Sequence, residues 1–144
     1  MYSTFLTLHS IFRWLVLISL LYAVISSIQR FLTKRHFSKK DATIRMVAGA
    51  ISHTQLLIGF TLYFVLSPIT RHFMSSGSGG NHQIWFFGFY HIGMMFIAIA
   101  VMTVGSSVSK RAKTDADKFK NIMIYFSIAL VLILLAIPWF RPFL

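Results

Sequence analysis

The sequence of 144 residues contains no cysteine and no glutamate, and its only acidic residues are Asp41, Asp115 and Asp117. Without cysteine, the chain cannot form a disulfide, use a thiolate in catalysis, or bind an iron–sulfur cluster. The lack of glutamate excludes a carboxylate-bridged di-iron centre, and apolar segments without acidic residues exclude a carboxylate proton relay. A glycine-rich phosphate loop, a nucleophile elbow and a His-Glu-x-x-His zinc motif are also missing. Most familiar enzyme classes are therefore excluded.

Hydrophobic residues, in contrast, make up 56% of the chain, and only 12% of the residues are charged. Four apolar runs cover about residues 5–29, 46–66, 84–106 and 121–140. Each run is close to the ~20 residues that an α-helix needs to cross a bilayer. We therefore expect an all-α integral membrane protein, in which residues 1–144 form a single four-helix, up-down bundle.

The net charge of +11 is concentrated in two short connections between the apolar runs. Eleven of the 14 Lys and Arg residues lie there: Arg30, Lys34, Arg35, Lys39, Lys40 and Arg45 in the first, and Lys110, Arg111, Lys113, Lys118 and Lys120 in the second. Basic loops stay in the cytoplasm and are attracted to anionic inner-leaflet lipid. This pattern predicts a multi-pass membrane protein, with both termini and the 67–83 loop outside and with membrane lipid rather than nucleic acid as partner.

Local signals refine the ends of the predicted helices. Pro68 marks the end of the second helix, and the glycines and serines after it predict a polar outer loop. The segment Thr114 to Asp117 resembles a capping box and predicts an interfacial turn that leads into the fourth helix. Pro138 and Trp139 predict the end of that helix at the outer interface.

Three histidines, His9, His53 and His91, fall within the first three helices, where an unpartnered imidazole would be costly. At a rise of 1.5 Å per residue, His9 lies about 8 Å and His91 roughly 11 Å below the outer end, whereas His53 lies about 21 Å from it. Two imidazoles at one depth can bind opposite faces of a porphyrin. His9 and His91 are therefore candidate metal ligands of a b-type haem.

Arg13, Gly88 and His53 are also assigned to the cofactor site. Arg13 follows His9 by one helical turn and predicts an anionic partner such as a haem propionate. Gly88, one α-helical turn before His91, would leave room for a flat ring, and Gly49 would do so beside His53. For His53 itself three roles stay open: a second haem site, a hydrogen bond to a quinone, or a brace between helices.

The segments around these histidines resemble a known family. The segment from His9 to Leu17, the segment from His53 to Phe64 with Ser67-Pro68, the segment from His91 to Gly105 and the closing Ile137-Pro138-Trp139 are similar to small four-helix bacterial membrane proteins generically labelled cytochrome B. The resemblance implies haem and strengthens the assignment of His9, His53, His91 and Arg13. In that family an acidic residue commonly precedes the third-helix histidine, where this chain has Tyr90.

We therefore expect a membrane electron-transfer component of the b-type cytochrome kind, rather than a stand-alone catalyst. It would hold one haem, or two if His53 completes a second site, near the outer face. A quinone is a further candidate cofactor, and a larger respiratory or membrane complex is the expected partner. Two alternatives stay open: a cofactor-free structural or assembly subunit of a membrane complex, and a copper-handling membrane protein.

Overall fold

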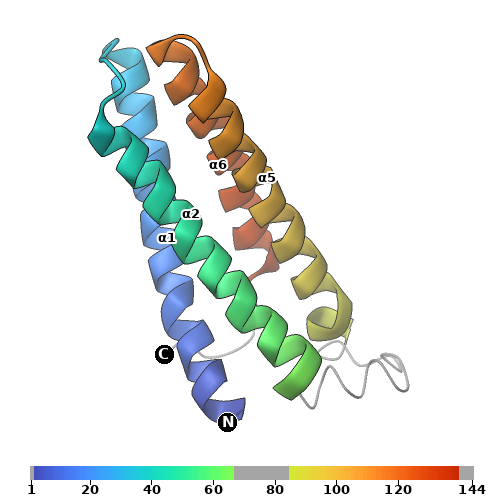
Figure 1. Cartoon of the computed structure of the whole chain (residues 1–144). Coiled ribbons are helices and arrows are strands. Elements are labelled where there is room, and N and C mark those ends of the chain that lie inside the picture. The colour runs from blue at the N-terminus through green and yellow to red at the C-terminus, as the bar shows by residue number, and fades with distance from the viewer. Residues whose placement is uncertain (1, 67–84, 140–144) are drawn as a thin grey trace.

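The computed structural model describes residues 2–66 and 85–139, in which four long helices lie side by side (Figure 1). The elements are α1 (Tyr2–Leu32), α2 (Lys39–Thr61), the π-helix η1 (Leu62–Leu66), the π-helix η2 (Phe86–Tyr90), α5 (His91–Arg111) and α6 (Asp115–Ala136). η1 continues α2, and η2 leads directly into α5. Each of the four bundle helices is long and apolar enough to cross a membrane. The prediction of an all-α four-helix bundle is thus confirmed for the described residues.

Helix ends follow capping residues rather than the ends of the apolar runs. α1 begins at Tyr2, α2 begins at Lys39 instead of near residue 46, and α5 continues to Arg111 instead of ending near residue 106. α6 covers Asp115–Ala136 instead of residues 121–140. Ser38 and Thr114 pair terminal backbone N–H groups at the starts of α2 and α6, so both helices begin before their hydrophobic runs. The loop after Leu66 with Pro68, and residues 140–144, lie outside the described residues.

Two helices, α2 and α6, are capped by side chains at the end of the bundle that holds the α1–α2 and α5–α6 turns. Ser38 and Asp41 form a reciprocal capping box at the start of α2. The Thr114 hydroxyl accepts a hydrogen bond of 3.1 Å from the backbone N–H of Asp117. The predicted cap at Thr114 is confirmed, and α6 begins directly after it without a separate interfacial turn.

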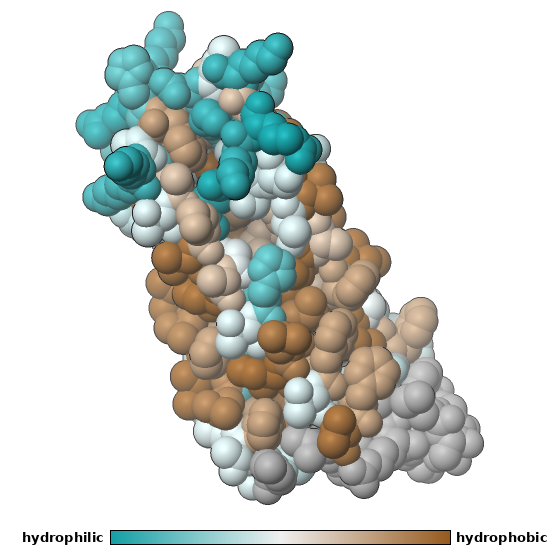
Figure 2. Space-filling view, in the orientation of Figure 1, coloured by the Kyte–Doolittle hydropathy of each residue, from teal (hydrophilic) through white to brown (hydrophobic). Residues whose placement is uncertain are grey.

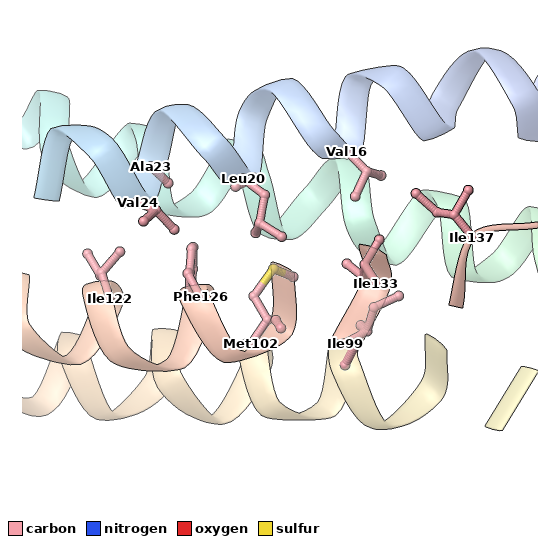
Figure 3. Packing of buried hydrophobic residues seen from close by; sticks show 13 residues of the cluster. Val16, Leu20, Ala23, Val24, Ile99, Met102, Ile122, Phe126, Ile133 and Ile137 are labelled. Carbon is pink, nitrogen blue, oxygen red and sulfur yellow. The ribbon is translucent and has the colours of Figure 1, made fainter. Parts of the chain in front are cut away.

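Neighbouring helices pack in the order α1, α2, α5, α6 around the bundle, so α1 and α5 lie diagonally opposite. The hydrophobic core lies mainly between α1, α5 and α6, with Leu20, Met102 and Phe126 at its centre (Figure 3). α2 contributes only Ala48 to this buried cluster. Consequently α2 has the lowest buried share of the four candidate spans.

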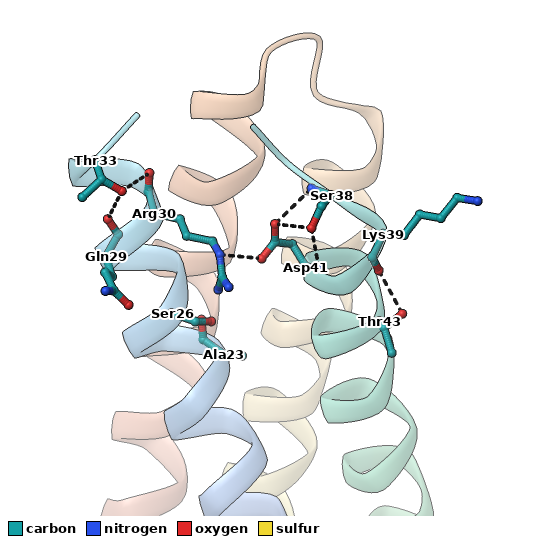
Figure 4. A network of polar contacts seen from close by, with 9 residues as sticks. All are labelled: Ala23, Ser26, Gln29, Arg30, Thr33, Ser38, Lys39, Asp41 and Thr43. Atoms are coloured by element: carbon teal, nitrogen blue, oxygen red, sulfur yellow. Dashed lines mark hydrogen bonds and ion pairs between the residues drawn. The ribbon is translucent and has the colours of Figure 1, made fainter. Parts of the chain in front are cut away.

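Charged residues gather at the end that holds the two turns, where Figure 2 shows the hydrophilic surface. Arg30 and Asp41 form an ion pair of 3.1 Å between α1 and α2 (Figure 4), and Asp41 is buried. Arg45, expected in the connecting loop, instead lies buried in α2, where it donates a hydrogen bond of 2.9 Å to the Ser106 carbonyl. Part of the basic cluster therefore joins helices instead of facing solvent or lipid headgroups.

Candidate functional site

His9 of α1 and His91 of α5 face each other across the bundle, near the end opposite the two turns. Their ring centroids are 6.1 Å apart, and the ring planes are nearly perpendicular at 79°. Because α1 and α5 are diagonal helices, the two rings meet at the bundle axis. The two residues are 82 positions apart in the sequence. Their contact agrees with the prediction that both lie at the same depth in the bundle.

The separation of the two rings suits a shared ligand. Two imidazoles joined by a direct N–H···N hydrogen bond have centroids roughly 5 Å apart. Two imidazoles that bind one metal ion between them, each at a nitrogen–metal distance of ~2.0–2.1 Å, have centroids roughly 6 Å apart. The observed 6.1 Å is close to the second value and also lies within the range of roughly 4.5–7 Å that edge-to-face ring contacts have.

His91 is oriented by its contacts with α6 and η2. Its Nδ1 lies 2.8 Å from the carbonyl oxygen of Ala136, and since a carbonyl only accepts, Nδ1 carries the proton. The lone pair of the neutral ring is then on Nε2, in the form in which a histidine binds a metal, with the backbone carbonyl as its outer partner. On the other side Phe86 stacks on the ring, with centroids 5.6 Å apart.

The π-helix η2 explains this stacking. The backbone N–H of His91 bonds to the carbonyl of Phe86, five residues earlier, so Phe86 rather than Gly88 is the residue one turn before His91. Short π-helical segments frequently occur at functional sites because they change the direction of the following side chains. The surroundings of Gly88, which was expected to leave room for a flat ring, lie outside the described side chains.

His9 lies against α2, and Gly59 and Gln55 are its neighbours there. A Cβ at Gly59 would lie 3.4 Å from Cε1 of His9, so this glycine makes room for the His9 ring. Nothing lies within 4 Å of a Cβ at Gly49. Gln55 donates a hydrogen bond of 2.7 Å to the His9 backbone carbonyl. The sequence alone did not indicate Gln55, since a glutamine among apolar residues has no distinctive spacing.

Two polar atoms at this contact are buried without a hydrogen-bond partner among the described residues. They are Nδ1 of His9 and Oε1 of Gln55. Buried polar atoms are nearly always paired, so an exception indicates strain, a functional role or a missing group. A protonated Nδ1 and an amide oxygen are complementary, and a small rotation that joined them would give His9 the same tautomer as His91.

Arg13 follows His9 by one turn of α1. Its Nε and Nη2 atoms are shielded from solvent, and its Cζ lies 5.3 Å from the centroid of the Trp14 ring. Trp14 is exposed, at 39%. A guanidinium thus lies within one turn of the histidine pair.

His53 lies away from this pair. It is exposed on α2, and its Nε2 lies 2.9 Å from Oγ1 of Thr103 on α5. Of the three roles left open for it, a contact between helices is the one directly observed. Nothing in this position pairs His53 with a second histidine among the described residues.

The donor set distinguishes between kinds of metal site. The described residues contain no cluster of three or more His, Cys, Asp or Glu side chains that could hold a bare metal ion. Zinc and copper sites in proteins commonly need three or four protein ligands, whereas a porphyrin supplies four nitrogens itself and needs only axial ligands. The pair of His9 and His91 supplies two candidate ligands, which is the number of axial positions of a haem iron.

Comparisons of the chain with protein-family models, curated proteins and solved structures find no match. The resemblance to proteins labelled cytochrome B accordingly stays a prediction. What the fold and the site define is a four-helix bundle with four candidate membrane-spanning helices and two histidines that face each other across its axis.

Proposed function

We propose that this protein binds one b-type haem between His9 and His91 and transfers single electrons within a membrane. The observation that carries the proposal is the 6.1 Å separation of two imidazole rings on diagonal helices. Bound haem would supply the reversible one-electron chemistry.

The residues of the chain would provide ligation, orientation and charge. Ala136 fixes the tautomer of His91 through its carbonyl, and Gln55 is placed to do so for His9. Such outer partners hold the ring orientation and raise the basicity of a ligand. Arg13 would place a positive charge beside the site, which favours the reduced state and attracts a propionate.

We infer a bacterial inner membrane as the location, with both termini on the outer side. The basic residues at the α1–α2 and α5–α6 turns support this orientation, because such clusters stay in the cytoplasm. His9 and His91 would then lie in the outer half of the bilayer. One haem is too few for a complete electron pathway, so we propose that the protein works as a subunit or partner of a larger respiratory or membrane complex.

Both rival functions are less well supported. A copper site would need further ligands, and the described residues offer no cluster of three His, Cys, Asp or Glu side chains. A cofactor-free assembly subunit would give no specific role to the facing rings of His9 and His91 on diagonal helices.

The visible spectrum of the protein purified in detergent tests the proposal. After expression with an adequate haem supply, the reduced protein should give the sharp bands of a low-spin haem with two histidine ligands. Extraction and metal analysis should find one haem iron per chain. A colourless preparation would exclude the proposed function, and copper in it would favour the copper-handling alternative.

A further inference from the structure

A second feature lies halfway along the hydrophobic face formed by α2 and α5, where a small hydrophilic patch stands apart from the polar end (Figure 2). His53 and Thr103, near the middle of α2 and α5, are exposed and in hydrogen-bond contact at 2.9 Å. A polar side chain exposed at this depth of a membrane is costly, and such residues commonly mark a ligand or proton site. The contact with Thr103 satisfies only one of the two ring nitrogens of His53.

The hydrogen bonds of Thr103 determine which nitrogen of His53 is protonated. Thr103 donates its single hydroxyl proton to the carbonyl of Ile99, at 2.7 Å. Its oxygen can therefore only accept from His53, so the proton of the neutral imidazole is on Nε2. Nδ1 then carries a lone pair, and it has no hydrogen-bond partner among the described residues. A group that pairs with this nitrogen must donate an O–H or N–H.

The described threonine hydroxyls on this face of α2 do not offer such a donor to a second copy of the chain. The other exposed hydroxyl beside His53 belongs to Thr54, which donates to the carbonyl of Ala50 at 2.8 Å. Thr61, two turns farther along, likewise donates to Leu57 at 3.0 Å. In a symmetric contact through this face, the hydroxyls of the partner would be committed to their own helix.

The surface next to His53 suits a flat apolar ring. One turn before it, Gly49 faces open space. Two turns away on the same surface, Phe60 of α2 and Phe96 of α5 stack with centroids 6.3 Å apart and ring planes at 28°. Seven residues separate each phenylalanine from its polar counterpart, which places the aromatic pair roughly 10 Å from the polar pair along the helices.

We propose that the α2–α5 surface around His53 binds a lipid-soluble hydroquinone, whose hydroxyl donates a hydrogen bond to Nδ1 of His53. The ring would lie over Gly49, and its apolar substituent would follow the surface toward Phe60 and Phe96. The choice of a redox-active ligand rests on the proposed function, but the binding itself does not require haem. The oxidised quinone offers only acceptors and cannot make this bond.

Equilibrium binding of decylubiquinol to the protein in quinone-free lipid nanodiscs tests the proposal, with empty nanodiscs as background. His53→Leu should weaken quinol binding roughly 3- to 30-fold, the range expected for one hydrogen bond in a membrane. Ile18→Ala is the control, since Ile18 is exposed on α1 and lies away from the α2–α5 surface. Wild-type protein should bind the quinol more tightly than decylubiquinone.

Two results would overturn the proposal: equal binding of quinol by the wild type and His53→Leu, or equal affinity of the wild type for quinol and quinone. A photoreactive residue at position 53 tests the other occupant of this surface. If the wild type binds no quinol and this residue cross-links to another protein, the surface is a protein-binding site instead. The haem spectrum is recorded on the same samples. Quinol binding through His53 in a protein without haem would reject the proposed function and retain this site.

Discussion

Gly105 of α5 packs directly against Tyr125 of α6, so closely that a Cβ at residue 105 would overlap Cβ of Tyr125. The atoms that would clash are close to both backbones, so no flexible side chain can move aside. Gly105 therefore sets how closely the two helices approach, as small residues do at membrane helix contacts.

Gly105→Ala should destabilise the bundle, because overpacking of this kind costs about 1–3 kcal/mol. Gly49→Ala and Gly93→Ala are matched controls, since nothing lies within 4 Å of a Cβ at either position. Both controls should be neutral or stabilising, by up to about 1 kcal/mol, through helix propensity. Thermal unfolding in one detergent provides the measurement, and equal midpoints for all three variants would contradict the packing described.

Substitution of the two facing histidines should separate ligands from bystanders. His9→Ala and His91→Ala should each convert the expected low-spin haem to a high-spin form or abolish haem binding. His53→Ala should retain the low-spin spectrum, because His53 contacts Thr103 on the surface. His36→Ala, in the exposed turn beside Asp115, is a second control. Loss of the spectrum in His53→Ala with an unchanged spectrum in His9→Ala would reverse the assignment.

Hydropathy and the period of the helices were enough to predict four membrane-length helices in one bundle, and equal depth predicted that His9 and His91 lie close together. The outer partners could not be predicted in the same way. Gln55 and the Ala136 carbonyl reach the histidines through tertiary packing, and a carbonyl leaves no trace in the sequence. The π-helix before His91 shifts each side chain relative to an α-helical pattern, which is why Phe86 takes the position expected of Gly88.

The same limit applies to charges. Arg45 was grouped with the basic loop because it follows five other basic residues, but helix α2 starts six residues before it. The capping box of Ser38 and Asp41 sets that start, so the buried bond from Arg45 to Ser106 follows from a polar motif rather than from hydropathy. Local capping signals were therefore the better guide to the end of this helix.

Gln55→Leu should weaken haem binding while leaving both axial histidines in place. Loss of an outer hydrogen-bond partner of a metal-bound histidine typically costs 10- to 100-fold in affinity. Gln55→Glu keeps an acceptor oxygen and should lower the reduction potential by making His9 more basic. Haem transfer to apomyoglobin measures the affinity, and an unchanged transfer rate in Gln55→Leu would exclude Gln55 as a partner of His9.

Membrane orientation can be tested with single cysteines, because the chain has none of its own. Ser3, at the start of α1, and Lys113, between α5 and α6, are both exposed and lie at opposite ends of the bundle. In intact cells an impermeant maleimide should label Ser3→Cys but not Lys113→Cys, and both should react after lysis. The reverse pattern would place the histidine pair in the inner half of the membrane.

Arg13→Ala should keep the haem but lower its reduction potential. A positive charge roughly 8 Å from the iron, at an effective dielectric constant of about 20, favours the reduced state by on the order of 2 kcal/mol, or about 90 mV for one electron. Arg13→Lys preserves the charge and should recover much of this difference. Redox titration followed in the visible bands provides the measurement. Equal potentials for wild type and Arg13→Ala would contradict this prediction. The guanidinium would then be too far from the iron, or too well screened, to set the potential, and its contact with Trp14 would be structural.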